Sequence, residues 1–116
     1  MSKRNSLFTR CEELLTMART RRIPGISSSV GTIMLEGKRI GEMFTIDTNY
    51  GRTSVRVQAY RHVVGCNRPD YFLIAFDDSA TTLLVYPTYN GSGDSEFRDD
   101  NSVVVRVSNF LKSKHL

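Results

Sequence analysis

The segment that decides the fold is Arg52-Thr-Ser-Val-Arg-Val-Gln-Ala-Tyr-Arg61, which is followed by an apolar run at residues 71–76 and another at residues 83–86. In the first segment, small or aliphatic residues alternate with basic and polar ones, which predicts a strand with two different faces. The run Tyr71-Phe-Leu-Ile-Ala-Phe76 does not alternate and is typical of a strand covered on both faces. Together these strands predict a small mixed sheet with a charged working face.

The chain before this sheet predicts one amphipathic helix over residues 5–22. Its apolar residues recur with the spacing of one helical face and are Leu7, Phe8, Cys11, Leu14, Leu15 and Ala18. Asn5 or Ser6 is the expected N-cap, because a short polar side chain accepts a hydrogen bond from the first turn. Pro24-Gly25 is expected to end the helix.

The remaining segments complete the predicted order of one helix and six strands. Residues 30–35 and 39–46 flank Glu36-Gly37-Lys38 and are interpreted as a hairpin. Strands are then expected at residues 52–62, 71–76, 81–86 and 102–107, with a flexible polar loop at 88–101 and a tail at 108–116. The predicted class is α+β: a single domain with its helix packed on a mixed, mainly antiparallel sheet of five or six strands within residues 29–107. The predicted core is Leu7, Leu14, Leu15, Val55, Val57, Phe72, Ile74, Leu84 and Val105.

Length, charge and cysteine content limit the classes of protein. The 116 residues correspond to one domain, and the formal net charge of +4 is concentrated in a basic N-terminal segment, whereas residues 77–100 are acidic. The basic end would be suited to bind a polyanion. Alternatively, its Arg and Lys side chains only keep the end of the helix in contact with water. No apolar run is long enough for a membrane span, and no export signal is seen, so we expect a cytoplasmic protein whose Cys11 and Cys66 are reduced. His62 and Cys66 have no second ligand pair, so a structural zinc site is not expected.

The order of the strands and the residue patterns within them resemble the PD-(D/E)XK nuclease superfamily, especially its small phage-associated, intron-associated and resolvase-like members. The resemblance covers about residues 5–107, and its corresponding stretches are Glu12 or Glu13, Glu42-Met-Phe-Thr-Ile46, Gln58-Ala59-Tyr60 and Asp70 through Pro87. It implies Glu42 and Gln58 as catalytic residues, with Glu42 as a ligand of Mg²⁺. Tyr60 stands where the family has Lys, and Arg61 points to the other face of a strand. The resemblance therefore implies absent or weak catalysis, with no cofactor unless Mg²⁺ supports activity.

The leading hypothesis is a nuclease-like domain that binds nucleic acid. Basic and aromatic side chains would contact phosphates and bases, and the candidates are Arg19, Arg21, Arg22, Arg52, Arg56, Tyr60 and Arg61. Tyr and Arg are equally suited to a protein interface, so a small phage-type inhibitor or adaptor that binds a host protein is the first alternative. An active Mg²⁺-dependent endonuclease is the second. A homodimer also remains open.

Overall fold

The computed structural model describes residues 6–20, 24–62, 69–87, 94–96 and 101–116. Within these ranges the chain forms two helices and one six-stranded sheet. In chain order the elements are α1 (Leu7–Thr20), β1 (Ser27–Leu35), β2 (Lys38–Tyr50), β3 (Thr53–His62), β4 (Tyr71–Phe76), β5 (Thr82–Pro87), β6 (Asp94–Glu96) and α2 (Asn101–Ser113).

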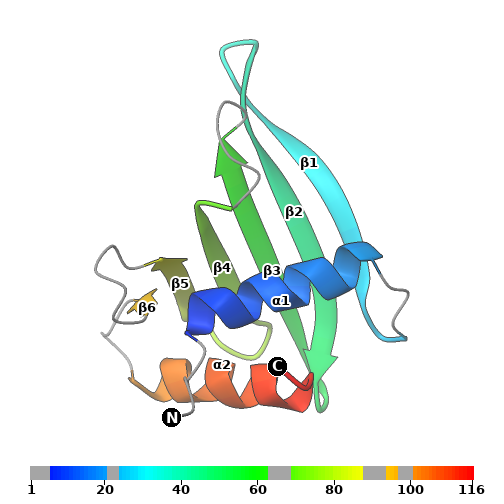
Figure 1. The fold of residues 1–116 in the computed structure, drawn as a ribbon, viewed down its shortest axis with the longest axis vertical. Helices are drawn as coiled ribbons and strands as arrows, with labels where there is room; N and C mark the ends of the chain where they lie inside the picture. Colours follow the sequence, from blue (N-terminus) through cyan, green and yellow to red (C-terminus); the bar gives the residue numbers. More distant parts are fainter. Residues whose placement is uncertain (1–5, 21–23, 63–68, 88–93, 97–100) are drawn as a thin grey trace.

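The sheet is a meander in which each strand pairs antiparallel with the next one along the chain. Both helices pack on the same side of the sheet, with α1 crossing the strands and α2 lying beside one end of them (Figure 1). We call this side the helix face and the opposite side the open face. The predicted α+β domain, with its N-terminal helix on an antiparallel sheet, is confirmed.

Helix α1 begins and packs as its sequence predicts. Ser6 is the N-cap, because its Oγ accepts a hydrogen bond of 3.1 Å from the backbone N–H of Thr9. Cys11 and Leu14 are fully buried against the sheet. Arg10 is also buried and donates hydrogen bonds of 3.2 Å and 2.9 Å to the hydroxyl and carbonyl oxygens of Ser108. This pair joins α1 to α2 across the core.

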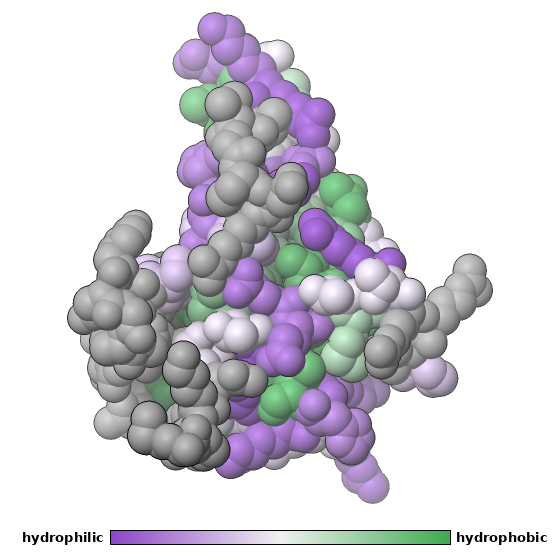
Figure 2. Space-filling view, in the orientation of Figure 1, coloured by the Kyte–Doolittle hydropathy of each residue, from purple (hydrophilic) through white to green (hydrophobic). Residues whose placement is uncertain are grey.

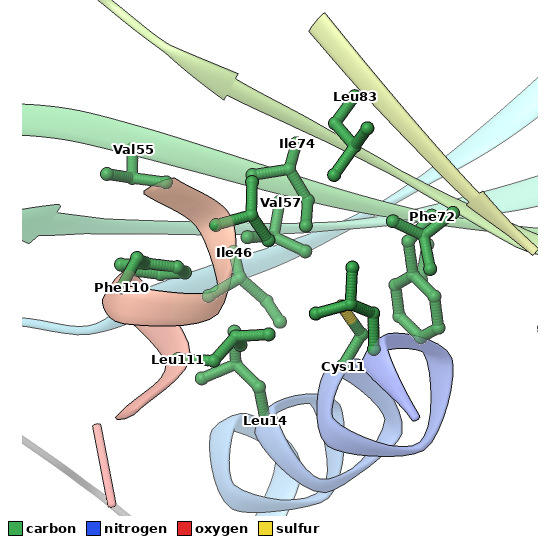
Figure 3. Close-up of a cluster of buried hydrophobic side chains, with 14 of the residues drawn as sticks. Cys11, Leu14, Ile46, Val55, Val57, Phe72, Ile74, Leu83, Phe110 and Leu111 are labelled. Carbon is green, nitrogen blue, oxygen red and sulfur yellow. The ribbon is translucent and has the colours of Figure 1, made fainter. Parts of the chain in front are cut away.

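The core lies between the two helices and the helix face. Side chains of both helices interdigitate with those of four strands in Figure 3. Phe8 of α1 meets Phe72 edge to face at 5.2 Å, and Phe110 of α2 meets Phe76 at 6.1 Å. Such aromatic pairs add to the free energy gained from burial alone. Seven predicted core residues are confirmed as buried: Leu7, Leu14, Leu15, Val55, Val57, Phe72 and Ile74.

The chain from β5 onward corrects several predictions. Residues 102–107 were predicted as a strand but belong to α2, although their three consecutive valines favour β structure locally. The buried positions Val107, Phe110 and Leu111 follow helical spacing. Val105 points away from them and is 57% exposed, so its core assignment is wrong.

The second correction concerns Leu84, which lies half-buried on the open face, whereas its neighbour Leu83 faces the core. The third concerns the predicted loop at 88–101, because Asp94–Glu96 pairs with β5 as a short strand. The mobility predicted for the other positions of that loop concerns residues 88–93 and 97–100, which lie outside the described residues. Arg106 anchors α2 through two hydrogen bonds of 2.8 Å and 2.7 Å to the Asp78 carboxylate.

The predicted hairpin of β1 and β2 forms, with Glu36 and Gly37 in the turn, both at positive φ. Ile33 pairs with Gly41 and Met34 pairs with Arg39, so Ile40 is an extra residue without a partner in β1. Such a bulge reverses the alternation of side chains on its strand. The hairpin projects away from the helices (Figure 1), and its bulge decides which side chains share the helix face.

Candidate binding surfaces

The register of the strands places three cross-strand rows on the open face. Met43, Tyr60 and Tyr71 form the first row, since directly paired residues point to the same side of a sheet. The second row is Thr45, Gln58, Leu73 and Leu84, and the third is Asp47, Arg56, Ala75 and Thr82. Tyr86 lies on the same side by alternation along β5. We define the open-face patch as Met43, Tyr60, Tyr71, Leu73, Leu84 and Tyr86.

Two stacked tyrosine rings form the centre of this patch. The rings of Tyr60 and Tyr71 are 4.8 Å apart and inclined by 14°. Gln58 donates a hydrogen bond of 3.2 Å to the sulfur of Met43, and its Oε1 lies 3.5 Å from the Tyr60 hydroxyl. Burial, followed by the nearby Tyr60 and Asp70, raises the pKa of Tyr71 above its ordinary value of 10.0. The aromatic pair is therefore partly shielded from water by its neighbours on the sheet.

Charged side chains at the margin of the open-face patch are largely engaged with one another. Arg56 donates from its Nε to Asp47 at 2.8 Å, with both side chains about half exposed. His62 lies 3.6 Å from Asp70, which also accepts a hydrogen bond from the His62 backbone. Arg52 is exposed at the turn before β3. The exposed Arg56–Asp47 ion pair contributes little to stability, but it places a carboxylate beside a guanidinium that a polyanion would otherwise contact.

The helix face carries a different cluster around Glu42. Its carboxylate pairs with Arg61 across β2 and β3 and with Arg39 at 2.7 Å. The bulge at Ile40 explains why Arg39, three residues away, reaches the same side. The hydrogen bond from Arg61 is the main cause that lowers the pKa of Glu42 below its ordinary value of 4.5, while burial opposes the change. Glu42 is therefore ionised and already paired with two cations.

A cavity of about 140 Å³ lies beside this cluster, between the last turns of α1 and strands β1 to β3. Glu42 and Arg61 line it together with Arg19, whose guanidinium lies 5.1 Å from the centre of the Phe44 ring. The other walls are apolar and are formed by Leu15, Val30, Phe44, Ala59 and Pro69. Next to the cavity, an added Cβ at Gly41 would lie 2.8 Å from the Arg61 carbonyl oxygen. The close approach of β2 to β3 at this position therefore requires glycine.

The structure separates the residues that were predicted to act together. Tyr60 and Arg56 lie on the open face, whereas Arg19 and Arg61 lie on the helix face. Arg52 lies at the turn between β2 and β3, and Arg21 and Arg22 lie outside the described residues. The predicted nucleic-acid contacts therefore do not form one continuous surface among the described residues.

The two predicted catalytic residues are also separated. Gln58 pairs with Thr45, and Glu42 lies three positions before Thr45 in β2, so the side chains of Gln58 and Glu42 point to opposite sides of the sheet. Within the described ranges, His, Cys, Asp and Glu side chains nowhere gather in a group of three that would hold a metal ion. The arrangement therefore lacks the shared site that joint action of Glu42 and Gln58 on one Mg²⁺ would require.

Sequence reasoning missed most of the open-face patch. Tyr71 and Leu73 were not candidates, because their strand was expected to be covered on both faces. Leu84 was assigned to the core, and Tyr86 was not singled out. The unbroken apolar runs in β4 and β5 were the available signal. These runs indicate an uncovered apolar surface only when it is known that both helices pack on the same side of the sheet.

No family model matches the chain. The comparisons with curated proteins and with solved structures likewise find no match. Among the described segments, neither helix combines the length and the apolar content that crossing a membrane would require.

Proposed function

We propose that this domain is a protein-binding module and that a folded partner docks on the open-face patch. The observation that carries the proposal is the apolar character of β4 and β5 on both sides, although both helices cover one side. An antiparallel sheet that faces water normally alternates apolar and polar residues. A second apolar face without a described covering element fits a surface that a partner buries.

The composition of the patch favours a protein over a nucleic acid. Aromatic residues and methionine are enriched at the centre of protein interfaces, where charged residues are depleted. The patch contains three tyrosines, two leucines and a methionine, and the Arg56–Asp47 pair lies at its margin. Gln58 already interacts with its neighbours Met43 and Tyr60. Contact area and shape, more than charge, would therefore determine affinity.

Site-specific photo-crosslinking in cells of the source organism tests this proposal. A photoreactive residue at position 84 should give one discrete protein adduct, and the same residue at position 105 should not. The Leu84 side chain is half-buried but reaches the surface within the patch, whereas Val105 is exposed on α2, away from the patch. The position-84 adduct should persist at high salt and disappear when Leu73→Lys is added. Equal adducts from both positions, or none from position 84, would reject the proposal.

Nucleic-acid binding is the second candidate, and one observation favours it. Arg56, Gln58 and Tyr60 share the open face, so phosphate and base contacts could lie side by side. The test is the fluorescence anisotropy of labelled DNA and RNA at several salt concentrations. Binding should weaken steeply with salt, and Arg52→Gln should flatten the slope by about one unit if it removes one phosphate contact. Binding without such a slope would argue against this candidate.

A further inference from the structure

The two edges of the sheet differ in how they are protected. β6 forms one edge and is three residues long, with acidic residues at both ends, Asp94 and Glu96. β1 forms the other edge, and its nine residues, Ser27–Leu35, include no charge and no proline. Short length, charge and proline are the usual features that prevent a sheet edge from pairing with another chain. β6 has two of these features, whereas β1 has none of the three.

The hairpin that carries this edge also exposes apolar side chains. Val30 is 63% exposed, Met34 is 55% exposed, and Leu35 and Ile40 are exposed as well. In Figure 2, which shows the helix side, hydrophobic patches interrupt the largely hydrophilic surface of the projecting hairpin. Exposed apolar side chains along an edge strand that pairs on one side only, among the described residues, are characteristic of a site where a further strand is added.

Gly31 lies at the middle of β1, and nothing within the described structure requires a glycine there. Its φ is not positive, and an added Cβ would come no closer than 3.9 Å to the Met43 carbonyl oxygen. Glycine weakens a strand, and one of its common roles inside strands is to allow another backbone to approach closely. A two-fold axis through this position would place the two Gly31 residues opposite each other.

We propose that two copies of this chain pair through β1, antiparallel about a two-fold axis at Gly31, and so join their sheets into one. This axis pairs Ser27–Leu35 with itself, with Val30 of one copy opposite Thr32 of the other. Because the strand is uncharged, identical copies meet without electrostatic repulsion. Pro24 lacks an N–H and limits the ladder at its end. The part of β1 near the hairpin turn projects beyond the helices, whereas α1 crosses the sheet toward the other end of this strand (Figure 1).

The mass of the full chain, measured by light scattering over a concentration series, tests this proposal. The native protein should have twice the mass of one chain and should dissociate on dilution. Val30→Lys combined with Met34→Lys should weaken the dimer by roughly tenfold or more, because the two-fold axis places position 30 of one copy diagonally opposite positions 30 and 34 of the other, so the introduced lysines repel one another. Val105→Lys is the matched control, since this valine is similarly exposed but lies on α2.

Amide hydrogen exchange then locates the interface. Alternate amides within residues 27–35 should be protected in the dimer and should exchange freely in the double variant. A native protein that is monomeric throughout the series overturns the proposal. So does equal dissociation by Val105→Lys, or a dimer whose β1 amides are unprotected. The dimer should survive Leu73→Lys, so it can fail or succeed independently of the proposed partner surface.

Discussion

The two faces of the sheet are made by the same strands, but they are stabilised differently. On the helix face, Ile46, Val57 and Ile74 have no exposed surface, because α1 and α2 cover them. On the open face, Leu73 and Leu84 are half-buried by their neighbours on the sheet. The difference shows that apolar content alone does not place a residue in the core. The number of layers packed on a strand decides it.

The largest expected effect compares two adjacent residues of β4. Ile74→Ala should lower the free energy of unfolding by about 2–5 kcal/mol, because it leaves a cavity in a closed core. Leu73→Ala on the open face should cost about 1 kcal/mol, because less apolar area returns to water. Urea denaturation of both variants measures the difference. Equal losses would show that the open face is as fully covered as the helix face.

An intermediate effect concerns Glu42 on the helix face. Its pKa is lowered in the folded state, chiefly by Arg61, so its contribution to stability is present above pH 4.5 and is lost as the pH falls through the folded pKa. The stability lost in Glu42→Gln should therefore be larger at pH 7 than in acid. Thermal unfolding at several pH values measures this loss.

The control for this experiment is Glu13→Gln, which changes an exposed carboxylate on α1. Its effect on stability should be smaller than that of Glu42→Gln at pH 7. If the effect of Glu42→Gln did not change with pH, the ion pairs of Glu42 with Arg39 and Arg61 would not form in solution.

The smallest expected effect concerns the pKa of Tyr71 on the open face. Its pKa is raised above 10.0, so the stability that this ring contributes is present below that value and declines as the pH rises through the folded pKa. Tyr60→Phe removes one of the causes, so the pKa of Tyr71 should fall but stay above 10.0, because burial is the larger cause. An NMR titration of labelled tyrosine measures it. An ordinary pKa for Tyr71 in the native protein would indicate that its ring is more hydrated than described.

Local sequence signals predicted α1, the first hairpin and the alternation along β3. Each depends on residues close together in the chain, such as the cap at Ser6 or the turn at Glu36-Gly37. They failed at α2, where valines favour a strand locally but the spacing of Val107, Phe110 and Leu111 lets a helix close the core. Tertiary packing outweighed the local preference there.

The candidate site was less predictable than the fold. Alternation within one strand tells which residues share a face, but relating two strands requires their register, and a shift of one residue reverses every side chain. The pairing of Thr45 with Gln58 placed Glu42 on the other side of the sheet, and the bulge at Ile40 brought Arg39 next to it. Neither the register nor the bulge can be derived from the residues alone.

By itself, the amino-acid sequence determined an α+β domain with one capped helix, an antiparallel hairpin and strands rich in apolar residues, because these features depend on local spacing and turn chemistry. Only the tertiary structure decided that both helices cover the same face, that the predicted arginines lie on different surfaces, and that β1 is the long uncharged edge. These properties depend on contacts between distant segments, such as that of Arg10 with Ser108, and such contacts form only when the whole chain packs.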